Sequence, residues 1–162
     1  MTLTVISWLD VFTRPLYVNE IVKRLQFCQE KKGLEIYAYV IMTNHIHLVA
    51  ARTEGEMSDV LKDFKSFTAK QLLNLILENQ KNPEKNGWKW FLNIMVLPQS
   101  KTKNMRFSRK QIILLPFGHQ QLYKRKLFIF MKIQFRAGYV LEPHEWHLSS
   151  ACPRSPIKVL SL

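Results

Sequence analysis

The order of the hydrophobic patterns in the first half of the chain leaves few folds open. A strand pattern at Thr2–Trp8 is followed by a helix pattern at Asn19–Gly33 and by two strand patterns, Leu34–Ile41 and His45–Ala50. A long amphipathic helix pattern then covers Ser58–Asn79. Two helices set against an antiparallel sheet predict an α+β fold of ferredoxin-like character, with the helices packed on the sheet.

Both helix patterns carry signals for their ends. Asn19 is the expected N-cap of the first helix and Gly33 its C′ residue, because asparagine caps helix starts and glycine accepts the left-handed backbone that ends them. Ser58 is the expected N-cap of the second helix. Five residues of this second helix are expected on or near its apolar face: Val60, Leu61, Phe64, Phe67 and Ile76.

The length and composition suit one compact domain. The chain has 162 residues, of which 47% are hydrophobic. Cys28 and Cys152 are too few for a disulfide framework and lack the C-x-x-C spacing of a zinc or redox site. The sequence contains no apolar run of membrane-spanning length and no signal-peptide pattern. We therefore expect a cytoplasmic protein with no membrane partner.

The positive charge of the chain is concentrated in one stretch. The formal net charge is +12, which favours a nucleic-acid partner through phosphate neutralisation. From Lys85 to Leu141 there are 12 Lys or Arg residues and no Asp or Glu, whereas the rest of the chain has 12 of each sign. Clean helix or strand periods also end near Trp90. The stretch is either a basic arm or a segment that is not read in its proper frame.

Two histidines lie one residue apart in the second hairpin strand. Side chains alternate along a strand, so His45 and His47 are expected to project to one side and Ile46 to the other. Two neutral imidazoles in this arrangement can share a divalent metal ion. Taken alone, an H-x-H pair is more often two ordinary histidines on a solvent-facing strand, so the surrounding sequence has to decide.

The surrounding sequence resembles the single-tyrosine HUH transposases, in particular the REP-associated tyrosine transposase branch of the IS200-like family. That family has a V-M-x-N-H turn before its metal-binding pair, matched here by Val40, Met42, Asn44 and His45–His47, with Met42 one residue further on. The stretches "LKDFKSFTAK" and "RAGYVLEPHEWHLSSA" resemble the lysine-rich helix and the C-terminal segment of the family. The resemblance covers about residues 2–92 and 136–162.

The resemblance implies a DNA transposase that nicks and joins single-stranded hairpin DNA through a phosphotyrosine. It implies Mg or Mn as the cofactor, held by His45 and His47, and a homodimer. It makes Lys62, Lys65 and Lys70 candidates for DNA binding, although a solvated helix face is an equally good explanation for each lysine.

Four aromatic residues are assigned structural roles. Tyr37 and Tyr39 precede the histidines on the neighbouring strand, and we interpret them as sheet residues rather than nucleophiles. Trp88 and Trp146 are interpreted as core or docking residues rather than platforms for stacked bases.

The tyrosine of the family is missing from its expected place. The family helix reads approximately Y-I-x-x-N-P-V before R-A-G, whereas this chain has "FIFMKIQF" before Arg136, so the tyrosine position falls at Phe128 and Ile129. Phenylalanine has no hydroxyl group, which predicts an inactive copy. Tyr123 and Tyr139 are weak substitutes because neither is in register.

A shift of reading frame accounts for this loss. If Phe128–Phe135 is encoded as TTT ATA TTC ATG AAA ATC CAG TTC, reading from the third base gives Tyr-Ile-His-Glu-Asn-Pro-Val. Met131 followed by Lys132 forces the glutamate, so the agreement does not depend on codon choice alone. We therefore predict that residues of about 95–135 are frame-disrupted and poorly specified, whether by a biological event or by a sequencing error.

Two other functions remain open from the residues. A ferredoxin-like remnant could bind nucleic acid without cutting it. An unrelated metal-dependent hydrolase would need acidic ligands beside the histidines, and Glu35 is the only acidic residue on the paired strand.

Overall fold

The computed structural model describes four parts of the chain: residues 1–5, 10–78, 107–108 and 132–161. Its centre is a four-stranded sheet in the order β2-β3-β1-β4, with antiparallel pairing between neighbours. The strands have these bounds: β1, Thr2–Val5; β2, Leu34–Ile41; β3, His45–Arg52; and β4, Phe107–Ser108. The predicted α+β class and the predicted hairpin of β2 and β3 are confirmed. The predicted first strand is confirmed as far as Val5, since residues 6–9 lie outside the described parts.

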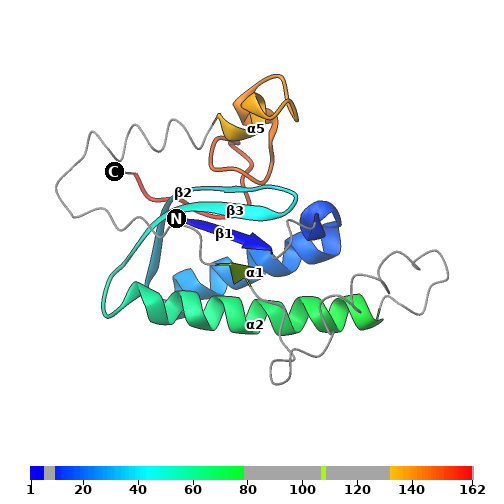
Figure 1. The fold of residues 1–162 in the computed structure, drawn as a ribbon. Coiled ribbons are helices and arrows are strands. Elements are labelled where there is room, and N and C mark those ends of the chain that lie inside the picture. The colour runs from blue at the N-terminus through cyan, green and yellow to red at the C-terminus, as the bar shows by residue number, and fades with distance from the viewer. Residues whose placement is uncertain (6–9, 79–106, 109–131, 162) are drawn as a thin grey trace.

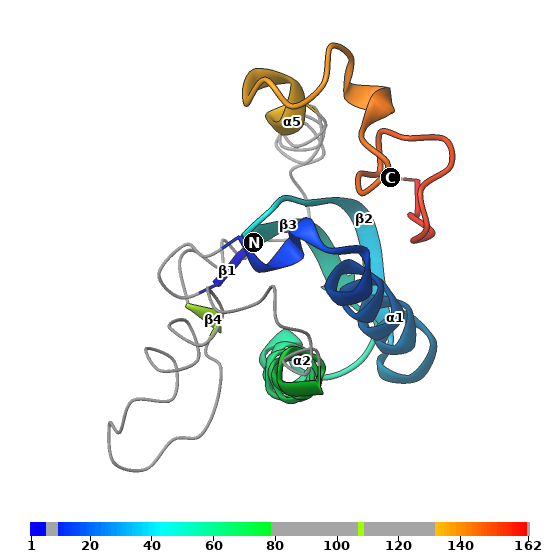
Figure 2. The same cartoon turned by 90° about the vertical axis from the view of Figure 1, so that its right-hand side faces the viewer.

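Both long helices cover the same face of this sheet (Figures 1 and 2). The helix α1 spans Pro15–Lys32 and α2 spans Met57–Glu78. Shorter helical turns occur at Val11–Thr13, at α5, Ile133–Arg136, and at Pro143–Glu145. Among the helices that the structure describes, none is long and apolar enough to cross a membrane.

The prediction that Asn19 caps α1 is wrong, because the helix begins four residues earlier. Arg14 has an extended backbone and Pro15 occupies the first helical position, where the missing N–H of proline costs nothing and its fixed φ suits the helix. Gly33 ends the helix as predicted: its φ is 62° and its N–H donates to the carbonyl of Cys28. The prediction that Ser58 caps α2 is also wrong, because the helix begins at Met57 and Ser58 lies inside its first turn.

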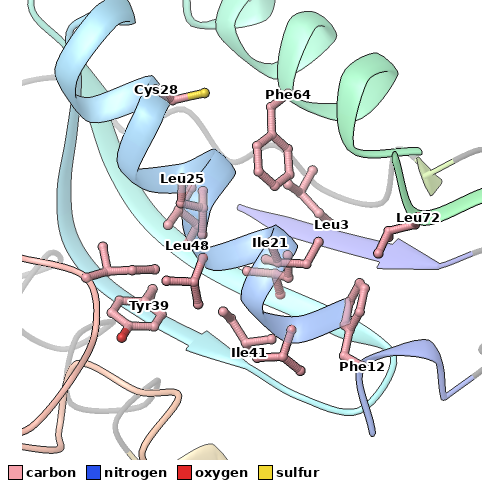
Figure 3. Close-up of a cluster of buried hydrophobic side chains, with 14 of the residues drawn as sticks. Leu3, Phe12, Ile21, Leu25, Cys28, Tyr39, Ile41, Leu48, Phe64 and Leu72 are labelled. Atoms are coloured by element: carbon pink, nitrogen blue, oxygen red, sulfur yellow. The ribbon is translucent and has the colours of Figure 1, made fainter. Parts of the chain in front are cut away.

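The core lies between the sheet and the two helices. Figure 3 shows Leu3 of β1, Ile21 of α1 and Phe64 of α2 pointing into one cluster, and all three are fully buried. Phe67 lies near this face but outside the core, because the residue is 40% exposed. Its ring lies under the guanidinium of Arg24, 3.8 Å from the ring centroid, so it covers the seam between the helices rather than the core.

The C-terminal segment, defined here as residues 148–160, lies along the outer edge of β2. Three backbone hydrogen bonds join the two: Ile41 to Leu148, Ser150 to Tyr39, and Leu160 to Ile36. The segment therefore occupies backbone groups that an edge strand would otherwise expose. Tyr37 and Tyr39 lie within β2, which confirms that they are sheet residues.

Candidate metal centre

The two histidines project from the face of the sheet that the long helices leave uncovered. Ile46 and Leu48 are buried on the helix side, so the alternation along β3 directs His45 and His47 to the opposite side. Thr2 of β1 is the direct partner of His47 in the antiparallel register and shares this face. The prediction that both imidazoles lie on one side is confirmed. Helix α5 lies on the side of the sheet opposite α1 and α2 (Figures 1 and 2), which is the side to which the alternation directs the imidazoles.

The imidazoles converge through the same ring atom. The Nε2 atoms of His45 and His47 are 3.1 Å apart, with ring centroids 4.7 Å apart and ring planes at 87°. Two ligands about 2.1 Å from one octahedral ion and at right angles to each other lie about 3 Å apart. The pair is therefore spaced as two neighbouring ligands of one divalent cation would be.

The other nitrogen of each ring is held by an oxygen atom. Nδ1 of His45 lies 2.6 Å from Oδ1 of Asn44, and Nδ1 of His47 lies 2.9 Å from the hydroxyl of Thr2. The amide of Asn44 donates in turn to Oδ1 of Asp10, at 2.9 Å. Oxygen partners at the non-ligating nitrogen are typical of metal-binding histidines, because they orient the ring.

Both imidazoles are neutral at physiological pH. Burial lowers the pKa of His45 below its ordinary value, with the nearby carboxylate of Asp10 opposing the shift. Burial, the positive charge that His45 would carry and the N-terminal amine together lower the pKa of His47 to about 4. A neutral imidazole is the form that binds a metal ion.

The donor set fits a divalent cation but is incomplete. Within the parts of the chain that the structure describes, no third His, Cys, Asp or Glu joins the two imidazoles. Glu35 does not provide it: it pairs with Ala51 at the far end of the β2–β3 ladder and accepts a hydrogen bond from Tyr37. Among the described residues, the metal-dependent hydrolase considered from the sequence therefore finds no acidic ligand beside the imidazoles.

The three candidate DNA-binding lysines lie on the helix α2, on the opposite side of the sheet from the imidazoles. Lys62 and Lys70 are exposed and Lys65 is half-buried. DNA that reached both the lysines and the histidines would have to pass around an edge of the sheet. The role of the lysines in DNA binding stays a prediction.

The region of the expected nucleophile is described only in part. Trp88, Tyr123, Phe128 and Ile129 lie outside the described residues. Tyr139 is described, and its ring is 51% exposed and 5.6 Å from that of Trp146. This places Tyr139 against an aromatic neighbour rather than against an imidazole.

Trp146 has the docking role expected from the sequence. Its indole N–H donates to the carbonyl of Ile41 at the end of β2, 3.0 Å away. Gln134 of α5 is fully buried and donates to the carbonyl of Pro143, so its amide helps to hold the chain that follows α5. These contacts hold α5 and the chain that follows it beside β2, the strand that pairs with the histidine-bearing β3.

The sequence did not single out two residues at the site, Thr2 and Asp10. Thr2 could have been found from the alternation of the first strand, had its register with His47 been known. Asp10 has no sequence signal, because it lies directly before the helical turn Val11–Thr13 and 34 residues before Asn44.

The chain was compared with curated proteins, solved structures and protein-family models. No curated protein matches the chain. A solved structure described as the REP-associated tyrosine transposase bound to a REP hairpin is similar at 13% identity, with a TM-score of 0.48, over 92% of this chain and 73% of that one. The model of the family "Transposase IS200 like" matches residues 7–96, which is more than half of the 162 residues. The chain therefore belongs to the IS200-like transposase family.

Proposed function

We propose that the protein binds single-stranded or hairpin DNA at the histidine face, with a Mg or Mn ion held by His45 and His47. The observation that carries this proposal is the convergence of the two Nε2 atoms at 3.1 Å in a member of this transposase family. The solved structure cited above is of a transposase bound to a hairpin, which suggests the class of DNA.

The two imidazoles supply a neutral pair of ligands, so a bound cation keeps its full charge. That charge would offset the negative charge of a DNA phosphate and stabilise it further in a transition state. Burial of the imidazoles removes competing protons at neutral pH, since the pKa of His47 is about 4.

We further propose that this copy does not cut DNA. Strand cleavage in the family needs a tyrosine hydroxyl in line with the phosphorus atom. The position that matches the family tyrosine is occupied by Phe128 and Ile129, whose side chains carry no hydroxyl. In this proposal residues of about 95–135 come from a shifted reading frame, which explains why a stretch without Asp or Glu lies inside a chain of otherwise balanced charge.

The test uses a fluorescent single-stranded hairpin, Mn²⁺ and the full-length protein. We expect binding that EDTA or His45→Ala weakens, and no covalent protein–DNA adduct on a denaturing gel. The matched control is His144→Ala, which removes an exposed imidazole away from the pair and should leave binding unchanged. A covalent adduct would show that a tyrosine of this chain attacks DNA and would refute the proposal that this copy does not cut DNA.

A second candidate function is metal-independent binding of nucleic acid by a ferredoxin-like remnant. The excess of 12 positive charges favours it, because phosphate neutralisation needs no cation site. Hairpin binding that is steeply salt-dependent, yet unchanged by EDTA and by His45→Ala, would select this function over the first.

A further inference from the structure

We infer that Asp10 and Asn44 lock the ring of His45 in one tautomer, whereas the hydroxyl of Thr2 lets His47 change tautomer when a cation binds. The inference concerns positioning residues and rests on the cation site of the proposed function. Its first test is made without metal, so that the tautomer inference can fail while the proposed cation site stands, and the reverse.

The lock begins at Asp10. An ionised carboxylate only accepts hydrogen bonds, so the group that Asn44 turns toward Asp10, 2.9 Å away, has to be its NH₂. The carbonyl oxygen of the same amide is then directed at Nδ1 of His45, 2.6 Å away. The orientation of the amide follows from the chemistry of its two partners.

The backbone holds the lock in place. The N–H of Val5 donates to the carbonyl of Asn44 and the N–H of Phe12 to the carbonyl of Thr43, at 2.9 and 2.8 Å. The hydroxyl of Thr13 donates to the carbonyl of Asp10 at 3.0 Å. The turn before β3 is thereby fastened to the segment that carries Asp10.

The amide oxygen determines where His45 keeps its proton. An oxygen acceptor 2.6 Å from Nδ1 requires a hydrogen on Nδ1. Neutral His45 then has its lone pair on Nε2, the atom that faces His47. His45 is therefore ready to bind a cation before one arrives.

Nδ1 of His47 faces a hydroxyl instead of an amide oxygen. Without a cation, the 3.1 Å contact between the two Nε2 atoms needs one hydrogen, and His47 has to supply it because the Nε2 of His45 carries none. Nδ1 of His47 then accepts from the hydroxyl of Thr2, 2.9 Å away. If His47 were to hold a cation through Nε2, that atom would have to present its lone pair, so neutral His47 would lose the proton on Nε2 and gain one at Nδ1.

A threonine hydroxyl suits this change because it can donate or accept. It donates to Nδ1 of His47 before the cation binds and accepts from Nδ1–H afterwards. One proton leaves the ring and one returns through solvent, so the net charge of His47 is unchanged.

The direct test is long-range ¹H–¹⁵N NMR of the histidine rings in the full-length protein. Without metal we expect His45 protonated on Nδ1 and His47 on Nε2. Adding Mg²⁺ should move the His47 proton to Nδ1 and leave the His45 tautomer unchanged. A metal-free His45 protonated on Nε2 would overturn the inference, even if Mg²⁺ binds.

Variants test the lock itself. Asn44→Ala should give His45 a mixture of tautomers and weaken Mn²⁺ binding, measured by electron paramagnetic resonance, by about 10- to 100-fold. Asp10→Ala alters an exposed residue and should have the same effect to a smaller degree. The matched control, Asp59→Ala, removes an equal charge on α2 and should leave both measurements unchanged.

A reversed pair separates positioning from folding. In Asp10→Asn combined with Asn44→Asp, the amide at position 10 donates to a carboxylate at position 44, which again accepts from Nδ1 of His45. We expect this pair to restore the single His45 tautomer. A wild-type tautomer in Asn44→Ala, or a mixed tautomer in the reversed pair, would overturn the lock. Failure of the wild-type protein to bind Mg²⁺ or Mn²⁺ would instead refute the proposed function.

Discussion

At the scale of single residues, Gly33 shows how backbone chemistry ends a helix and starts a strand. Its φ of 62° lies in the left-handed region, and a Cβ added there would meet the side chain of Thr53 at 3.5 Å, an ordinary contact. Gly33→Ala therefore tests backbone strain without a clash. We expect it to lower the free energy of unfolding by about 1 to 2 kcal/mol in urea denaturation, and Gly33→Asn to lower it less. An alanine variant as stable as the wild type would contradict this.

The orientation of the two imidazoles also depends on single residues. Asp10, Asn44 and Thr2 are ordinary polar residues whose importance depends on the ring atoms that they face. Changing Asp10 or Asn44 should alter the metal affinity more than the free energy of unfolding, because the hydrogen bond between these two residues lies at the surface.

At the scale of elements, the C-terminal segment completes the edge of β2. Ile157 is 1% exposed and Val159 is 38% exposed, so the two residues form a matched pair of anchor and control. We expect Ile157→Ala to cost about 2 to 5 kcal/mol of stability and to speed hydrogen exchange at the backbone N–H groups of Ile41 and Ser150. Val159→Ala should change neither. Unchanged exchange in Ile157→Ala would show that other contacts hold the segment on the sheet.

At the scale of the whole molecule, restoring the reading frame should restore chemistry. We expect a gene with one base corrected near each end of the codons for residues 95–135 to encode a protein that forms a covalent adduct with hairpin DNA in Mn²⁺. The reason is that the restored segment carries a tyrosine hydroxyl and ends directly before Arg136, the last residue of α5, which lies on the side of the sheet opposite α1 and α2. The control is the same corrected gene with that tyrosine changed to phenylalanine, which should form no adduct. A corrected protein that fails to form one would contradict the frameshift hypothesis.

The homodimer implied by the family resemblance stays a prediction, and light scattering of the corrected protein would test it.

Local patterns were enough to predict the elements and one side of the site. Periodicity places β2, β3 and α2 within a residue or two, because side-chain direction repeats every two residues in a strand and every 3.6 in a helix. The same rule placed His45 and His47 on one face. The capping preference that pointed to Asn19 failed, because Pro15 begins α1 four residues earlier. Phe67 lies near the helix face but outside the core, where the guanidinium of Arg24 covers its ring.

Contacts between distant segments could not be read from such patterns. The pairing of Thr2 with His47, the approach of Asp10 to Asn44 and the seat of the C-terminal segment on β2 all join residues at least 34 positions apart. A local pattern predicts the direction of a side chain but not its contact partner. The partner depends on the register of the strands and on the conformation of the turns. The amino-acid order thus supplied two imidazoles on one face, and the tertiary structure supplied the oxygen atoms that orient them.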